Sequence, residues 1–210
     1  LPDYAFDFLQ KEFHTYLTIG GMPEIIRNYI QSGSLSGMDE YYHDIWQSYQ
    51  DDIEKYGRNT NQKNVLRHIL QTAAFEKDRI TMTGFGNSNY RSRETGEALR
   101  ALDKSRIIRL VYPVTSTLMP LQVDFKRKPR LQFLDTGLLN HILGIQSSLV
   151  GLADFSTAYR GRIIQHAVYQ QLESRNAMVG QKLHFWVREK TNTSSEVDIV
   201  YPHHGFLIPV

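Results

Sequence analysis

The spacing of apolar residues changes twice along the chain, and these changes constrain the fold more than any other feature of the sequence. Over residues 1–57, apolar and aromatic side chains recur every three or four positions, which is the period of an amphipathic helix. Residues 58–128 carry two more helical periods and then a run rich in β-branched residues, which favours a strand. Residues 129–210 combine short strand patterns with one long helical period. We therefore expect an α+β protein of three successive segments.

The first segment, residues 1–57, is predicted to form helices separated by glycine-containing breaks. Gly20-Gly21 ends the first helix, and Pro23 suits the first turn of the next one because the backbone N–H that proline lacks has no partner there. Side chains at steps of three and four are expected to face the core: Tyr42, Trp46, Tyr49, Ile53 and Tyr56. The opposite face is acidic, and we interpret it as solvated rather than as a metal site: Asp44, Asp51, Asp52 and Glu54.

The second segment, residues 58–128, is predicted to be a winged helix-turn-helix unit. An amphipathic helix over residues 65–73 is followed by a polar stretch with two glycines and by a helix that Ser92 is expected to N-cap. A β-branched run over residues 106–112 then reads as a strand that Pro113 ends. Helix, helix and strand in this order are typical of a winged helix, although other small α+β units share the order.

The third segment, residues 129–210, begins with a short strand and with a helix that starts at Asp135. A longer helix is expected over residues 159–175, with Ile164, Val168 and Leu172 on its inner face. Three strands follow, and a hairpin loop that contains glycine joins the last two: residues 182–187, 196–201 and 206–210, with the loop at 202–205.

Composition limits the class of protein. Hydrophobic residues make up 41% of the chain and charged residues 22%, which is ordinary for a globular protein, and no apolar run approaches the roughly 18 residues of a membrane helix. The absence of cysteine excludes disulfides and thiolate metal sites and fits a reducing compartment. Without a secretory leader, we expect a cytoplasmic protein with no membrane partner. Because Leu1 stands in place of Met, we also expect a piece of a longer protein.

Positive charge is concentrated in the middle of the chain. The net charge is only +2, but the window from Gly84 to Arg130 holds ten Lys and Arg against four Asp and Glu. Such a window indicates one anion-binding face, and in a winged helix the second helix enters the major groove of DNA. The alternative is a cationic surface that touches only acidic residues of a neighbouring segment. The candidate nucleic-acid contacts, with DNA as the favoured type, are Arg91, Arg93, Arg100, Lys104, Arg106, Lys126, Arg127 and Lys128.

Several catalytic motifs are missing from the sequence. Gly84-Phe85-Gly86 lacks the third glycine and the Lys-Ser or Lys-Thr pair of a phosphate-binding loop, so we expect no ATP binding by this chain. No His-Glu-x-x-His or Gly-x-Ser-x-Gly pattern occurs, and the pair His203-His204 lies in a polar turn. We therefore expect no cofactor in this chain.

Glu196-Val197-Asp198 offers half of a divalent-metal nuclease site. Mg²⁺ prefers carboxylate oxygens, and a bound metal ion can activate water for attack on a phosphodiester. A complete site would need a carboxylate from the preceding helix and a Glu-x-Lys on the next strand. From the residues alone, a strand-end role for Asp198 is favoured.

Several segments in order together resemble one family, the prokaryotic AAA-type ATPases with a C-terminal domain of unknown function. The segments are Gly20–Glu24, Asp52–Tyr56, Pro129–Leu139, Gly161–His166, Phe185-Trp186 and Glu196–Asp198. The resemblance implies a winged helix and a restriction-endonuclease-like α/β domain truncated at its C-terminus. It also implies an ATP-binding module with Mg upstream, for which residues 1 to about 30 would be the end of the helical lid.

For the nuclease-like site, the resemblance implies an acidic residue in the long helix, where this chain has Gln165. Asp198 matches the family pattern, and the family's Glu-x-Lys would fall just after Val210. Three hypotheses follow: a nucleic-acid-binding or regulatory region of an ATPase, a metal-dependent nuclease, and a degenerate nuclease-like fold that binds proteins. The partners implied are DNA, the chain's own ATPase module and a second copy of the chain. Gln165 favours the third hypothesis over the second.

Overall fold

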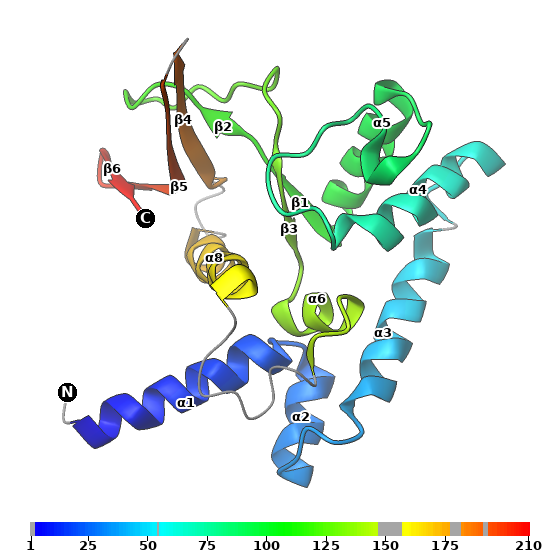
Figure 1. Cartoon of the computed structure of the whole chain (residues 1–210), viewed down its shortest axis with the longest axis vertical. Coiled ribbons are helices and arrows are strands. Elements are labelled where there is room, and N and C mark those ends of the chain that lie inside the picture. The colour runs from blue at the N-terminus through cyan, green and yellow to red at the C-terminus, as the bar shows by residue number, and fades with distance from the viewer. Residues whose placement is uncertain (1–2, 54, 147–156, 177–181, 191–192) are drawn as a thin grey trace.

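The computed structural model describes residues 3–53, 55–146, 157–176, 182–190 and 193–210, and it has a mixed α+β architecture. The N-terminal helices lie at the bottom of the molecule in Figure 1, and a helical unit and a four-stranded sheet lie at the top. Helix α8 crosses the space between them. None of the helices in the described ranges has the length and apolar character needed to cross a membrane.

The N-terminal segment forms three helices, α1 (Asp3–Ile19), α2 (Pro23–Ser32) and α3 (Met38–Ile53). As predicted, Gly20 follows the end of α1 and α2 begins at Pro23. The stripe on α3 is only partly confirmed. Tyr42 and Ile53 are buried and Trp46 and Tyr49 are partly buried, but Tyr56 is 48% exposed because α3 ends before it. Glu54, which the sequence places on the acidic face, lies outside the described residues.

The middle of the chain forms a compact helical unit. Helix α4 (Thr60–Ala73) buries the predicted apolar face, and Asn59 caps it by accepting a hydrogen bond from the Gln62 backbone N–H at 2.9 Å. A 3₁₀ turn, η1 (Phe85–Asn87), precedes α5 (Ser92–Lys104), which is followed by β1 (Ile108–Val111). The expected N-cap is wrong by one residue. Arg91 holds that position, and the Glu94 carboxylate accepts a hydrogen bond from the Arg91 backbone N–H at 3.0 Å.

Two small sheets follow from the strands. β1 pairs antiparallel with β3 (Arg130–Phe133), and an isolated antiparallel bridge joins Arg79 to Arg130. The second sheet has the order β2-β4-β5-β6, with β2 parallel to β4 and the other pairs antiparallel: β2 (Pro113–Val114), β4 (His184–Lys190), β5 (Thr193–His203) and β6 (Phe206–Pro209). The hairpin loop is shorter than expected. Pro202 and His203 belong to β5, and His204 and Gly205 form the turn with positive φ, as two-residue hairpins favour.

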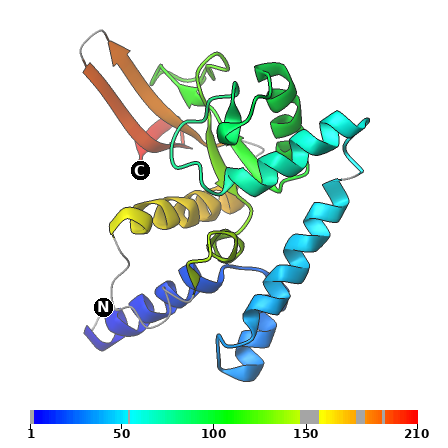
Figure 2. The same ribbon diagram turned by 45° about the vertical axis from the view of Figure 1, so that its right-hand side comes forward.

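Two further helices join these parts, α6 (Thr136–Ile142) and α8 (Thr157–Asn176). The expected inner face of α8 is confirmed only in part: Ile164, Val168 and Leu172 pack against the core, but none of the three is fully buried. The helix is packed from two sides. Ile163 and Ala167 contact Leu17 of α1, whereas Tyr169 packs against β1, β4 and β5. Figure 2 shows α8 lying between α1 and the sheet, an arrangement that buries more than one face of the helix.

Candidate nucleic-acid interface

Helix α5 separates its apolar and cationic residues onto different faces. Ala98, Leu99 and Leu102 are buried in the core that α5 shares with α4 and β1. The exposed face carries Arg93, Glu97, Arg100 and Lys104, at steps of four, three and four residues. Arg93 contacts Glu97 at 3.0 Å, and this hydrogen bond, with the charges of Arg93 and Arg100, holds the pKa of Glu97 below its usual value. One carboxylate therefore lies among three exposed cations.

Two further candidate residues flank this helix. Arg91 is exposed at the N-cap of α5, and Arg106 is exposed in the turn that follows the helix. The turn places Arg106 at a positive φ of 64°, and the Arg106 backbone N–H donates to the Asp103 carbonyl at 3.1 Å. Arg91 and Arg106 thus extend the cationic face of α5 at both of its ends.

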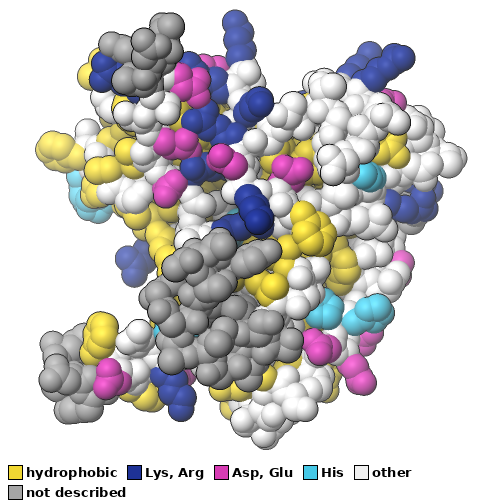
Figure 3. Space-filling view, viewed as in Figure 1, with side chains coloured by type: hydrophobic (Ala, Val, Ile, Leu, Met, Phe, Trp, Pro, Cys, Tyr) yellow, Lys and Arg dark blue, Asp and Glu magenta, His cyan; other side chains and the backbone are white. Residues whose placement is uncertain are grey.

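The loop before β3 carries three candidate residues, which differ in their exposure to solvent. Lys126 and Lys128 are exposed, but Arg127 is partly buried and turned toward Asp124 and Glu189. Arg127 Nε lies 3.2 Å from Asp124 Oδ2. In Figure 3, Lys and Arg side chains protrude along the upper edge of the molecule, which is where Figure 1 shows α5 and the region around β2. Seven of the eight candidates are therefore exposed, and Arg127 is bound by acidic residues of the chain itself.

A cluster of ion pairs joins the two sheets, and we call it the arginine clasp: Arg79, Arg127 and Arg130 with Glu189, Glu196 and Asp198. Arg79 contacts Glu196 at 2.7 Å and also Glu189. Arg130 contacts Asp198 at 2.8 Å and also Glu196, and Arg127 contacts Glu189. Figure 3 shows acidic and basic side chains intermixed beside β4.

An aromatic ring lies beneath the clasp. The guanidinium carbons of Arg130 and Arg79 lie 4.8 and 5.6 Å from the ring centroid of Phe185, within the range of cation–π contact. The hydrogen bond from Arg79, followed by the charge of Arg127, holds the pKa of Glu189 below its usual value. The clasp is thus a charge-matched contact between segment 79–130 and the strands β4 and β5.

The two positions that the resemblance assigns to a nuclease-like site both lie near Arg130. Asp198 is on β5, and its side chain is 61% exposed and paired with Arg130. Gln165 is on α8 and lines a cavity of about 10 Å³ together with Arg130 and His166. Burial, and then the charge of Arg162, lowers the pKa of His166 to about 3, so this histidine is neutral at pH 7. Within the described ranges, no group of three or more His, Asp and Glu side chains is placed to hold a metal ion.

Sequence reasoning missed Arg79 and Glu189 altogether and did not treat Arg130 as a site residue. Glu189 lies 110 residues from Arg79, and Asp198 lies 68 residues from Arg130. No local pattern marks such pairs, because they form only when the two sheets come together. The one available signal was the balance of charges between the basic centre and the acidic ends of the chain.

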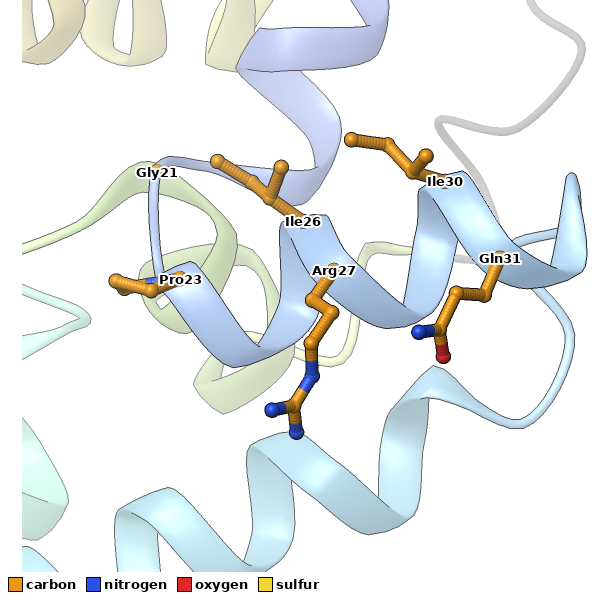
Figure 4. A pocket seen from close by; sticks show the side chains of 6 residues that line it. All are labelled: Gly21, Pro23, Ile26, Arg27, Ile30 and Gln31. Atoms are coloured by element: carbon orange, nitrogen blue, oxygen red, sulfur yellow. The ribbon is translucent and has the colours of Figure 1, made fainter.

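An apolar hollow of about 520 Å³ lies on α2, away from these charged groups. Figure 4 shows Ile26 and Ile30 on one side of the helix and Arg27 and Gln31 on another. Ile30 is 74% exposed, and the only charged lining residue, Arg27, lies 3.8 Å from Glu24. This hollow is lined mainly by apolar side chains, and its lining includes no carboxylate or histidine that could act on a phosphodiester.

Comparison with known proteins gives a family. A family model described as a domain of unknown function, DUF8612, matches residues 10–149, which extend from α1 past the end of α6. The chain belongs to this family. No curated protein and no solved structure matches the chain. The matched residues include the cationic face of α5 and the loop with Lys126 and Lys128, whereas Gln165 and Asp198 lie beyond them.

Proposed function

We propose that this chain binds nucleic acid, with DNA as the favoured type, through a winged-helix unit in which α5 is the helix that contacts the groove. The observation that carries the proposal is the division of α5 into a buried apolar face and an exposed face with Arg93, Arg100 and Lys104. In helix-turn-helix proteins the second helix enters the major groove, and arginine and lysine there bind phosphates and guanine edges.

The order of elements around α5 supports the winged-helix interpretation. Helix α4 precedes the bridge between Arg79 and Arg130, where the Ile80 N–H donates to the Pro129 carbonyl at 2.8 Å. The 3₁₀ turn η1 and α5 follow, and then β1 and β3 pair across a connecting segment that contains β2. In the proposed unit this segment takes the place of a wing, and it carries the exposed Lys126 and Lys128. The proposed unit extends to Phe133, because β3 completes its sheet.

The test is a fluorescence anisotropy titration of a short labelled DNA duplex over a series of salt concentrations. Affinity is expected to fall steeply with salt, because each neutralised phosphate releases condensed counterions. The triple variant Arg93→Ala, Arg100→Ala, Lys104→Ala should bind all sequences more weakly. It should also flatten the slope of log K against log salt by up to about three.

A charge-matched control separates this face from general electrostatics. Lys11, Arg27 and Lys55 are exposed cations on or near α1, α2 and α3, and replacing them with alanine removes the same charge. The control should leave the slope unchanged. No binding by the wild type at low salt, or an equal loss in both triple variants, would overturn the proposed interface.

A second candidate function is a non-catalytic interaction module. The observation that favours it is the pairing of Glu196 and Asp198 with Arg130, which leaves the acidic strand neutralised within the chain. In this alternative, the C-terminal part is a degenerate nuclease-like fold that binds a second copy or the ATPase module of a longer protein. Phe206 and Ile208 are exposed on β6 and offer apolar surface for such contact. Sedimentation of the wild type and of the variant Phe206→Ser, Ile208→Ser tests self-association, which should weaken in the variant.

A further inference from the structure

The three arginines of the arginine clasp are paired with carboxylates of the chain itself. They are therefore less available to an anion than the exposed Lys126 and Lys128. Arg127 lies between these two exposed lysines in the sequence, and its side chain is turned toward Asp124 and Glu189. Arg79 and Arg130 face each other across an isolated β-bridge, and they contact the carboxylates of β4 and β5. A polyanion bound to the two lysines would therefore lie next to guanidinium groups that are occupied by the chain's own acids.

We propose that Glu189, Glu196 and Asp198 act as an internal competitor for nucleic-acid phosphate, so that the arginine clasp limits the affinity of the proposed interface. This inference rests on the nucleic-acid binding proposed above. In the free protein the carboxylates hold Arg79, Arg127 and Arg130. In the complex, phosphate groups take over some of these arginines, and the released carboxylates return to water.

The exposure of the carboxylates makes this exchange feasible. The side chains of Glu189 and Asp198 are 43% and 61% exposed and that of Glu196 is 27% exposed, so releasing the first two into water requires less rearrangement than releasing Glu196. The arginine partners are 14–30% exposed, so salt screens these ion pairs less than pairs that are fully exposed. A phosphate group also accepts two parallel hydrogen bonds from a guanidinium, as a carboxylate does. Phosphate can therefore replace a carboxylate with similar geometry.

The groups around each arginine set the extent of the exchange. Arg127 has Asp124 as a second partner, and Arg130 has Asp78 at 3.9 Å. Arg130 has the least exposed side chain of the three and lies closest to the Phe185 ring. Arg127 has the most exposed side chain and lies in the loop between the lysines. Arg127 is therefore expected to change partners first.

The test uses the isosteric variant Glu189→Gln, Glu196→Gln, Asp198→Asn in the same anisotropy titration. Because the freed arginines can contact phosphate, affinity at low salt should rise by about tenfold or more. The slope of log K against log salt should steepen by about 0.9 for each added phosphate contact. A control variant, Glu40→Gln, Asp44→Asn, Asp51→Asn, removes the same charge from the exposed face of α3. It should raise affinity less and leave the slope unchanged.

The outcomes separate the clasp from the proposed function. Equal effects of the two variants, with normal wild-type binding, would overturn the clasp and leave the interface standing. No binding by the wild type or by the clasp variant would overturn both. Binding by the clasp variant alone would overturn the function proposed for the wild type and would show that the clasp blocks the surface completely. If circular dichroism shows that the triple variant is unfolded, the single change Glu189→Gln, at the carboxylate of β4 that pairs with Arg127, should steepen the slope by about one, and an unchanged slope would contradict the clasp.

Discussion

The carboxylate of Asp135 accepts a hydrogen bond at 2.6 Å from the backbone N–H of Gly21, which lies 114 residues earlier in the chain. The same side chain N-caps α6 by accepting from the Leu138 N–H at 2.8 Å. Gly20 is at a φ of 71°, and a Cβ built on it would overlap the Asp135 carboxylate. One side chain therefore fixes the break between α1 and α2 and the start of α6 at once.

Replacing Asp135 with alanine should destabilise the fold by about 2–4 kcal/mol. Loss of an N-cap costs about 1 kcal/mol, and a buried N–H left without a partner adds about 1–3 kcal/mol. Urea unfolding followed by circular dichroism measures the change. Asp135→Asn keeps an acceptor oxygen and should lose less stability than Asp135→Ala. An alanine variant as stable as the wild type would show that these two hydrogen bonds are not needed for stability.

Gly137 and Gly161 should respond to alanine in opposite directions. A Cβ on Gly137 would overlap the Ile19 carbonyl, where α6 touches the end of α1. Gly137→Ala should therefore destabilise by about 2–3 kcal/mol, as overpacking of a close contact does. Gly161 lies in α8 with nothing within 4 Å of its Cβ position, so Gly161→Ala should stabilise by about 0.5–1 kcal/mol. Thermal melts of both variants are the measurement, and a Gly137→Ala variant that melts at or above the wild-type temperature would refute the contact at Gly137.

The pH dependence of stability should contain a contribution from His166. Burial lowers its pKa from 6.5 to about 3, so the unfolded chain binds a proton between these values and the folded chain does not. The stability that His166 contributes is therefore present above pH 6.5 and is lost as the pH falls toward 3. Where the unfolded chain is fully protonated at this histidine and the folded chain is not, the free energy of unfolding falls by about 1.4 kcal/mol for each pH unit. Urea unfolding of the wild type and of His166→Gln at several pH values isolates the contribution of His166. The same pH dependence of unfolding free energy in both proteins would contradict it.

Local signals in the sequence predicted most of the helices and strands. Pro23 and the glycines before it placed the break between α1 and α2, and the β-branched run placed β1. What the sequence could not supply were relations set by packing between distant segments. The buried face of α8 depends on two partners that cover it from different sides, and the bond from Gly21 to Asp135 spans 114 residues. The shared face of the candidate cations on α5 could be predicted because the helical period alone places them together. The pairing of Arg127 could not, because it depends on Glu189 of β4.

This chain is predicted to lack nuclease activity. A divalent metal ion at such a site is held by opposing carboxylate oxygens that leave positions open for water and phosphate. Here Asp198 is paired with Arg130 at 2.8 Å, and Gln165 offers only a neutral carbonyl oxygen. The guanidinium of Arg130 would also repel a metal cation placed beside Asp198.

Plasmid and single-stranded DNA incubated with the protein in Mg²⁺ and in Mn²⁺ should therefore remain intact. The variant Asp198→Ala serves as the control, since it removes the one carboxylate that the resemblance assigns to the site. Intact DNA with both proteins is the expected result. Cleavage by the wild type that disappears in Asp198→Ala would show that Asp198 leaves Arg130 and binds a metal ion with partners other than Gln165. Cleavage that persists in the variant would show that the activity does not depend on Asp198.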